Sequence, residues 1–155
     1  MTNVHLSPVR LFLVEDSPAD VDLTRLALEE NNMSFHLDVA SDGEEAVEYL
    51  RQLDEANLIL PDLIILDLNV PKINGLEVLK LIKGNPRTQL TPVIVLTTSG
   101  AHADMVACYK NYANCYITKP LDFEEFIEVI REIKAFWFTV AKIPNKAAHA
   151  RYFTY

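Results

Sequence analysis

The chain has 155 residues, of which 50% are hydrophobic and 23% are charged, and this length and composition suit one globular domain with a sizeable core. Its net charge of −8 argues against a nucleic-acid-binding surface, because phosphate contacts need clustered lysine and arginine. Apolar runs fall far short of the ~20 residues that span a bilayer. Residues 1–8 lack the basic and apolar segments of a secretion signal. We therefore expect a cytoplasmic protein without membrane or nucleic-acid partners.

Sequence patterning predicts five strands that alternate with five helices. Residues 63–66 and 92–97 are mostly apolar runs, typical of strands buried on both faces, whereas 35–40 alternates apolar and polar residues as a half-buried edge strand does. Ser17 and Pro18 mark the first helix start, because serine caps helices and proline favours the first turn. The predicted strands are at 10–15, 35–40, 63–67, 92–97 and 114–118. The predicted helices alternate with them: one from 18 to about 31, one that opens at 41–43, one that ends at 84–86, a weak one through 106–109 and a long one from 122 to about 141.

This alternation predicts an α/β fold in which a parallel sheet carries helices on both faces. Right-handed crossovers then give a doubly wound, flavodoxin-like (βα)5 sheet with the strand order 2-1-3-4-5. In such a sheet the order reverses between strands one and three, and ligands bind at the carboxyl ends of the strands there. The functional site is therefore expected where the strands at 10–15 and 63–67 end.

Apolar spacing within two helices predicts which side chains face the core. The first helix is expected to present Asp20, Asp22 and Glu29 outward and to carry one inner stripe of Leu23, Leu26, Ala27 and Glu30. A helix that is apolar on two sides needs a cover on each, so a dimer partner, or alternatively the chain's own tail, is expected over a second stripe of the last helix. That helix has a core stripe of Phe123, Phe126, Ile127, Ile130 and Trp137, and a second stripe of Val129, Ile133, Phe136 and Val140.

Acidic residues follow the two strands that flank the predicted switch point. Glu15 and Asp16 end the first strand, and Asp67 ends the third. Like charges about 4 Å apart repel by roughly 1 kcal/mol per pair even in bulk water, so three gathered carboxylates need a cation. Three hard oxygen ligands suit Mg²⁺, and the sequence therefore predicts a magnesium site formed by these residues.

Two further strands end in groups that bind phosphate. Thr97 ends the fourth strand and Lys119 follows the fifth. We expect a phosphoryl-transfer site where a carboxylate, a metal ion, a hydroxyl and an ammonium face one another. In such a site Asp67 attacks phosphorus and becomes an aspartyl phosphate. Mg²⁺ and Lys119 neutralise charge on the transferred group. Each residue alone has an ordinary alternative: Asp67 as a loop cap, Glu15 and Asp16 as a solvated strand end, Lys119 as a surface lysine and Thr97 as a hydroxyl bonded to backbone.

Over residues 9–138 the chain resembles the receiver domain of two-component response regulators. The resemblance rests on four motifs in order: Glu15–Asp16, Asp67 with Pro71 and Gly75 after it, Thr97, and Lys119–Pro120. It implies that Asp67 is the phosphoacceptor, that Lys119 pairs with the phosphate, and that Thr97 bonds a phosphoryl oxygen. The Lys119–Pro120 peptide bond is expected to be cis, as is usual in the family.

The same resemblance implies the metal ligands and a switch residue. Asp16 is expected to bind Mg²⁺ directly and Glu15 to bind it through water, with the backbone carbonyl of Asn69 as a further ligand. Tyr116 matches the aromatic residue that turns inward when Thr97 is drawn to the phosphate.

A closer resemblance links the chain to the single-domain response regulators of cyanobacterial and bacterial phytochromes. It rests on residues 96–99, residues 114–119 and the Phe136–Trp137 ending of the last helix. In these relatives a phosphohistidine on the phytochrome kinase donates the phosphoryl group, and many form homodimers through the helix-four to helix-five side. We therefore expect a phytochrome-type histidine kinase as partner, a homodimer through that side, and a downstream phosphorelay protein.

The expected organisation is an N-terminal arm at 1–8, a receiver domain at 9–141 and a C-terminal tail at 142–155, with no output domain after the last helix. The expected function is that of a stand-alone response regulator. We expect a phosphoacceptor and not an enzyme, because the chain would catalyse only its own phosphotransfer and dephosphorylation.

Three alternatives fit the sequence less well. An aspartate-nucleophile phosphatase of the dehalogenase type needs a second acid two residues after its nucleophile, and Asn69 stands there. A pseudo-receiver that only binds partners would lack Asp67 or Lys119, and both are present. A nucleotide-binding protein of the same architecture needs clustered glycines, whereas the four glycines of this chain are scattered.

Overall fold

A five-stranded parallel sheet forms the centre of the protein, whose computed structural model describes residues 8–144. The strands lie in the order β2-β1-β3-β4-β5, so the predicted doubly wound, flavodoxin-like α/β fold is confirmed. The predicted N-terminal arm and C-terminal tail fall outside the described residues, except for Pro8 and residues 142–144. The strands are β1 (Val9–Val14), β2 (Phe35–Ala40), β3 (Leu63–Leu66), β4 (Val93–Thr97) and β5 (Cys115–Thr118).

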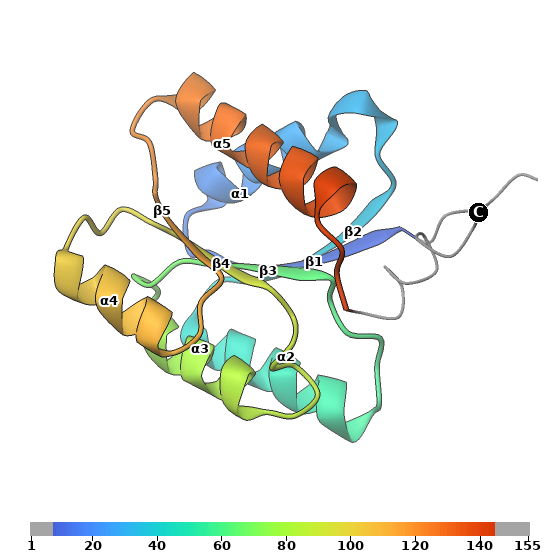
Figure 1. Cartoon of the computed structure of the whole chain (residues 1–155), viewed down its shortest axis with the longest axis vertical. Coiled ribbons are helices and arrows are strands. Elements are labelled where there is room, and N and C mark those ends of the chain that lie inside the picture. The colour runs from blue at the N-terminus through green and yellow to red at the C-terminus, as the bar shows by residue number, and fades with distance from the viewer. Residues whose placement is uncertain (1–7, 145–155) are drawn as a thin grey trace, which may run out of the picture.

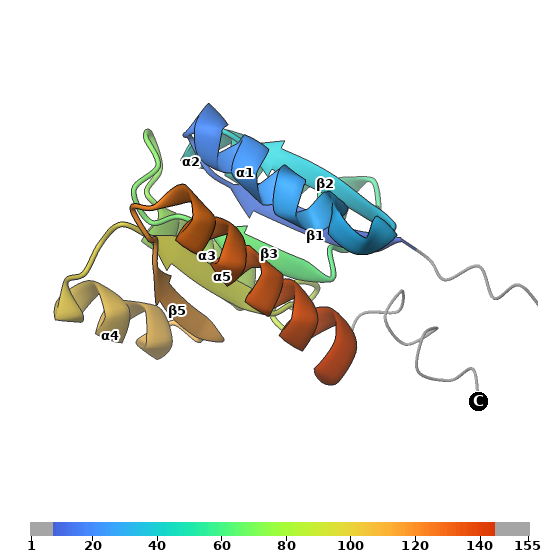
Figure 2. The ribbon, with the colours of Figure 1, turned by 90° about the horizontal axis from the view of Figure 1, so that it is seen from above.

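Helices cover both faces of the sheet. α1 and α5 pack on one face and α2 and α3 on the other, while α4 lies beside the β5 edge (Figure 1; Figure 2). Within the described residues, none of the helices has the length and apolar content that a bilayer crossing requires. The helices are α1 (Pro18–Glu29), α2 (Gly43–Glu55), α3 (Gly75–Gly84), α4 (His102–Lys110) and α5 (Phe123–Ala135), and a π-helical turn (Phe136–Val140) extends α5.

Capping side chains set where four of these helices begin. The side-chain oxygens of Ser17, Asp42, Asn74 and Asp122 each accept a hydrogen bond from the backbone N–H three residues further on. Such a cap satisfies a donor that the helix leaves free and is worth about 1 kcal/mol. α4 follows Ala101, which provides no side-chain cap, and this agrees with the prediction that the helix is weak.

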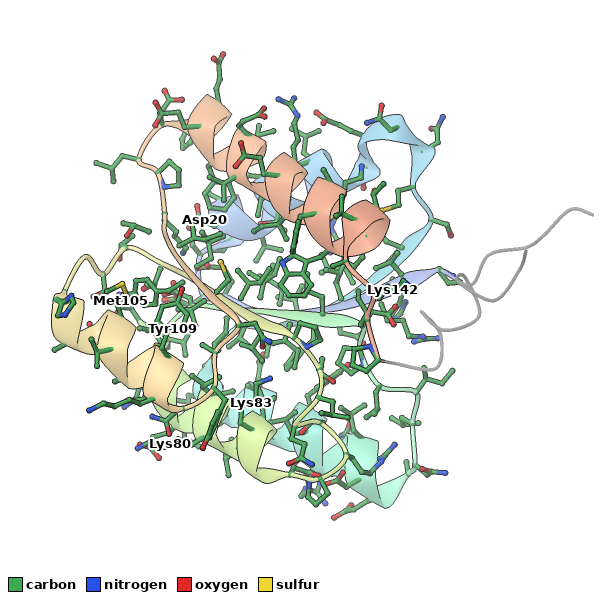
Figure 3. The ribbon with its side chains drawn as sticks, in the orientation of Figure 1. Asp20, Lys80, Lys83, Met105, Tyr109 and Lys142 are labelled. Carbon is green, nitrogen blue, oxygen red and sulfur yellow. The ribbon has the colours of Figure 1, made fainter. Side chains whose placement is uncertain are left out.

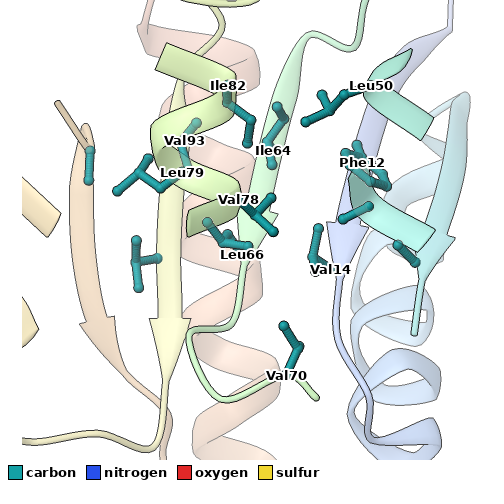
Figure 4. Close-up of a cluster of buried hydrophobic side chains, with 14 of the residues drawn as sticks. Phe12, Val14, Leu50, Ile64, Leu66, Val70, Val78, Leu79, Ile82 and Val93 are labelled. Carbon is teal, nitrogen blue, oxygen red and sulfur yellow. The ribbon is translucent and has the colours of Figure 1, made fainter. Parts of the chain in front are cut away.

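Alternate residues of the strands contribute to two separate hydrophobic clusters. On the face covered by α2 and α3, Ile64 and Leu66 pack with Leu79 (Figure 4). On the opposite face, Ile65 belongs to the cluster that includes Ile130 of α5. β3 is therefore buried on both faces, as its apolar run predicts, and the ends of the strands are what remains for ligands.

The last helix differs from its predicted stripes. Ile133, placed on a second apolar stripe, is only 5% exposed and belongs to the core. The reason is its spacing, because it follows Phe126 by seven residues and Ile130 by three and so shares their face. Phe123 is 66% exposed, since as the first residue of α5 it has no preceding turn to pack with. Of the predicted second stripe, the exposed side chains are those of Phe136 and Val140.

The first helix also differs from its predicted orientation. Ala27 is buried as predicted, whereas Leu26 is half exposed, and α1 also buries Thr24 and Leu28. Asp20 lies four residues before Thr24 and eight before Leu28, so it belongs to this inner face and does not point outward as predicted. The Thr24 hydroxyl donates to the Asp20 carbonyl at 2.7 Å, which lets a polar residue occupy the buried side of the helix.

Two glycines bring the loop that follows β3 into close contact with its surroundings. A Cβ atom at Gly43 would lie 1.7 Å from the carbonyl oxygen of Ile73, and the Gly43 N–H donates to the Pro71 carbonyl at 3.0 Å. A Cβ atom at Gly75 would lie 2.3 Å from the carbonyl oxygen of Asp67. The start of α2 and the start of α3 can therefore press against this loop only because neither carries a side chain there.

Replacing Gly43 with alanine is expected to lower the free energy of unfolding by about 1–3 kcal/mol, because the new methyl group meets rigid backbone. Gly84→Ala is the matched control, since nothing lies within 4 Å of a Cβ there and alanine is the better helix former. Urea unfolding measures both variants. Equal stabilities for the two would show that the loop does not need the close approach at Gly43.

Candidate functional site

The carboxyl ends of four strands bring the predicted site residues to one edge of the sheet. Glu15, Asp67 and Lys119 each stand one residue beyond a strand, and Thr97 is the last residue of β4. The N–H groups of Glu15, Asp67 and Lys119 still donate to carbonyls of neighbouring strands, at 3.0, 3.0 and 2.7 Å. Sheet pairing thus fixes the backbone of these three residues.

Three carboxylate groups meet beside β1 and β3. Oxygen atoms of Glu15, Asp16 and Asp67 all lie within 4.8 Å of one another. Glu15 and Asp67 are buried and Asp16 is exposed, so the group opens to solvent on one side. Three hard oxygen donors at this separation fit a divalent cation such as Mg²⁺ or Mn²⁺, with water in its remaining coordination positions.

Lys119 places one ammonium group among these carboxylates. Its Nζ lies 2.5 Å from Glu15 Oε2, 2.9 Å from Asp20 Oδ2 and 2.9 Å from Asp67 Oδ2, and only 5% of its side chain is exposed. Burial alone lowers the pKa of Lys119, but the hydrogen bonds to the three carboxylates outweigh burial and raise it. The ammonium therefore stays charged at neutral pH, with all three of its N–H donors engaged.

The ionisation of Glu15 depends on the positive charge beside it. Burial raises the pKa of Glu15, and the hydrogen bond from Lys119 only partly offsets that effect. The backbone N–H of Ser17 also donates to Glu15 Oε1, at 3.1 Å. A second positive charge near this carboxyl would favour its ionised form further.

Asp20 is the contact of Lys119 that the sequence prediction missed. It belongs to the first turn of α1 (Figure 3), and its carboxylate reaches Lys119, the residue that follows β5. Its spacing from Thr24 and Leu28 was the signal that could have placed it on the inner face of α1. The signal was overlooked because an acidic residue in the first turn of a helix is usually a solvated one.

Asn69 connects the loop after β3 to the end of β4. Its side-chain Nδ2 donates to the hydroxyls of Thr97 and Thr98, each at 3.3 Å. Its backbone N–H donates to Asp67 Oδ1 at 3.0 Å, while Lys119 donates to Asp67 Oδ2. One oxygen of Asp67 is thus held by the loop and the other by the lysine, and Asn69 links Thr97 to the same carboxylate.

Tyr116, the predicted switch residue, lies half-buried on β5. Its hydroxyl donates to the Ser99 carbonyl at 2.8 Å, and its ring packs against the cluster on the α2 and α3 face. The ring is therefore tied to the loop that follows β4. The peptide bond between Lys119 and Pro120 is trans, so the cis bond expected from the resemblance is not found.

Both the sequence and the structure are similar to those of known response regulators. The sequence model of the response regulator receiver domain matches residues 11–131. Response regulator Rcp1 of Synechocystis sp. is 39% identical over 138 residues, which cover 88% of this chain and 94% of Rcp1. The crystal structure of the phosphorylated cyanobacterial phytochrome response regulator RcpA has a TM-score of 0.85 and 41% identity, over 90% of this chain and 100% of its own. That of the Mn²⁺-bound form of Rcp1 has a TM-score of 0.82 and 38% identity, over 88% and 99%.

Replacing Asp16 with asparagine is expected to raise the free energy of unfolding in metal-free buffer by roughly 1 kcal/mol, because the change removes repulsion from Glu15 and Asp67. Urea unfolding at low ionic strength with a chelator present measures the effect. Asp22→Asn, on the exposed side of α1, is the control and should stay within about 0.5 kcal/mol of the unmodified protein. A decrease in stability for Asp16→Asn would contradict the inferred crowding of charge.

Proposed function

The chain belongs to the response regulator receiver domain family, and we propose on that premise that it is a stand-alone response regulator of a two-component phosphorelay. In this proposal it accepts a phosphoryl group on Asp67 and signals through protein contacts that depend on phosphorylation. The observation that carries the proposal is the buried Asp67 carboxylate, which contacts the Lys119 ammonium and lies beside the carboxylates of Glu15 and Asp16. The reactions assigned to the chain are its own phosphotransfer and dephosphorylation.

Asp67 is the proposed nucleophile. One of its carboxylate oxygens forms a bond to phosphorus while the bond from phosphorus to the donor's histidine nitrogen breaks, and the electron pair of that bond stays with the histidine. Lys119 donates hydrogen bonds to the phosphoryl oxygens and keeps its proton, as its raised pKa requires. The Thr97 hydroxyl is the proposed donor to another phosphoryl oxygen.

The proposed ligands of Mg²⁺ are Glu15, Asp16, Asp67 and the backbone carbonyl of Asn69. We assign direct binding to Asp16 and binding through water to Glu15. The bound ion would supply positive charge that offsets the charge of the transferred phosphoryl group. The spacing of the three carboxylates and the Mn²⁺-bound form of the relative Rcp1 support a divalent cation at this place.

Thr97 and Tyr116 form the proposed switch. The Thr97 hydroxyl now accepts a hydrogen bond from Asn69 Nδ2. A phosphoryl group on Asp67 would offer the proton of this hydroxyl a charged acceptor, and hydrogen bonds to charged acceptors are stronger than those between neutral groups. Movement of Thr97 would displace the loop that contains Ser99, whose carbonyl now accepts from Tyr116. Phosphorylation can bias the two arrangements only through such differences in contact, and we assign that difference to Thr97 and Lys119.

A phytochrome-type histidine kinase is the proposed phosphodonor. The support is similarity to Rcp1 and to the phosphorylated cyanobacterial phytochrome response regulator RcpA. We propose that transfer takes place in the cytoplasm and that a downstream phosphorelay protein receives the signal. The proposal assigns these contacts to the receiver domain at 9–141, with 1–8 as an arm and 142–155 as a tail.

A homodimer through the α4–α5 side is part of the proposal. α4, β5 and α5 lie along one side of the molecule (Figure 2), where Tyr112 follows α4 and the π-helical turn follows α5. Tyr112, Phe136 and Val140 are 75%, 51% and 70% exposed. Large exposed apolar side chains at the ends of these elements support a protein contact, and a second copy of the chain is the cover we propose.

Replacing Asp67 with asparagine is expected to abolish phosphorylation, because an amide cannot form the acyl phosphate. Acetyl phosphate with Mg²⁺ serves as donor, and intact mass spectrometry counts the phosphoryl groups. Beryllofluoride binding should disappear in the same variant. Asp22→Asn is the control and should be phosphorylated as the unmodified protein is. Stoichiometric, Mg²⁺-dependent modification of Asp67→Asn would refute the assignment of the phosphoacceptor.

Replacing Phe136 with aspartate is expected to lower the apparent mass in light scattering from two chains toward one, because it puts a charge into the proposed apolar interface. Leu90→Asp, which changes an exposed leucine between α3 and β4, controls for the added charge and should leave the mass unchanged. Circular dichroism establishes that both variants are folded. An unchanged mass for Phe136→Asp would remove this dimer face and favour the tail as its cover.

A further inference from the structure

Asp20 differs from the other acidic residues of the site in what it contacts. Glu15, Asp16 and Asp67 form the group whose oxygens lie within 4.8 Å of one another, and among the described residues Asp20 is not part of that group. Its Oδ2 instead lies 2.9 Å from Lys119 Nζ. It also comes from the first turn of a helix, whereas the other acids lie within two residues of the end of a strand.

The same two carboxylates serve both Lys119 and the proposed cation. Lys119 lies 2.5 Å from Glu15 and 2.9 Å from Asp67, and both belong to the acidic group that fits a divalent ion. A cation that binds there competes with Lys119 for Glu15 and Asp67. Phosphorylation of Asp67 likewise turns one of its carboxylate oxygens into the bridging oxygen of an acyl phosphate, which no longer carries the negative charge of a carboxylate. Of the three carboxylates that contact Lys119, that of Asp20 is the one that neither binds the proposed cation nor carries the phosphoryl group.

The backbone around Asp20 holds its side chain in place. The Asp20 N–H donates to Ser17 Oγ at 3.3 Å, and its carbonyl accepts from the Thr24 hydroxyl at 2.7 Å. These bonds belong to the capped first turn of α1, which packs against α5 on one face of the sheet (Figure 1). Only a quarter of the Asp20 side chain is exposed, so its carboxylate meets Lys119 in a partly dehydrated setting where ion pairs are stronger than in water.

We infer that Asp20 is a positioning residue. It holds the Lys119 ammonium beside Asp67 while the cation binds Glu15 and Asp67, the other two partners of the lysine, and while Asp67 carries the phosphoryl group. This inference rests on the proposed function. During transfer from acetyl phosphate, an Asp67 oxygen bonds to phosphorus, the phosphorus–oxygen bond to acetate breaks, and acetate leaves with the electron pair. Lys119 donates hydrogen bonds throughout and loses no proton, so its contribution depends on where Nζ stands.

The first consequence concerns the rate of phosphorylation. Asp20→Ala should lower the maximal rate with acetyl phosphate by at least about tenfold, because a misplaced ammonium stabilises the transferred group less, with little change in the acetyl phosphate concentration that gives half the maximal rate. Asp20→Asn keeps an oxygen acceptor and should retain a rate within about threefold of the unmodified protein. Asp22→Ala, two residues away on the exposed side of α1, should have no effect.

The second consequence concerns the binding of Mg²⁺ alone. Without Asp20, Lys119 depends on Glu15 and Asp67 and competes harder with the ion for both. Calorimetric titration with Mg²⁺ should therefore give a dissociation constant raised at least about threefold in Asp20→Ala, a change that a helix-stabilising role alone would not produce. Urea unfolding of each variant separates this effect from loss of structure.

The outcomes separate this inference from the proposed function. If the unmodified protein is not phosphorylated at all, the proposed function fails. If it is phosphorylated and folded Asp20→Ala reacts at the same rate with the same Mg²⁺ affinity, only the positioning role fails. An equal loss of rate in Asp22→Ala would also overturn that role, because the effect would then come from the acidic charge of α1 as a whole.

Discussion

The rest of the site depends on the contacts that the Lys119 ammonium group makes with acidic side chains. The ammonium contacts carboxylates of Glu15, Asp20 and Asp67, which belong to the end of β1, the first turn of α1 and the end of β3. Two of these carboxylates are buried, and buried acids without a positive partner would cost several kcal/mol each. A strand order that sets β1 beside β3 is what allows one lysine to serve all three.

The loop that follows β3 turns this charge balance into a defined geometry. Asp67 is held at Oδ1 by the Asn69 N–H and at Oδ2 by Lys119, so its carboxylate has a fixed orientation before any ligand arrives. Gly75 lets the start of α3 approach the Asp67 backbone. Asn69 also reaches the Thr97 hydroxyl, and Tyr116 reaches the Ser99 carbonyl, so the surroundings of Asp67 connect to the β5 edge and to the proposed dimer side.

The sequence was sufficient to predict the fold and the residues at the strand ends. The alternation of strand and helix patterns predicted a parallel sheet covered on both sides, and the unbroken apolar run of β3 agreed with it. That topology places Glu15, Asp67 and Lys119 at one edge of the sheet. Orientation within helices was predicted less well. Asp20 and Thr24 are polar residues on the inner face of α1, and Ile133 shares a face with Ile130, so a simple division into apolar and polar stripes misplaced Asp20 and Ile133. Contacts between α1 and the site arise only from the packed tertiary structure.

The most direct test of the account is to identify the residue that carries the phosphoryl group in the unmodified protein. After reaction with acetyl phosphate and Mg²⁺, borohydride reduction converts an aspartyl phosphate to homoserine, and tandem mass spectrometry of the peptides locates it. The account predicts homoserine at position 67 and its absence when a chelator replaces Mg²⁺. Homoserine at another aspartate, or an equal yield in the presence of the chelator, would contradict the central claim that Asp67 reacts within a cation-binding acidic site.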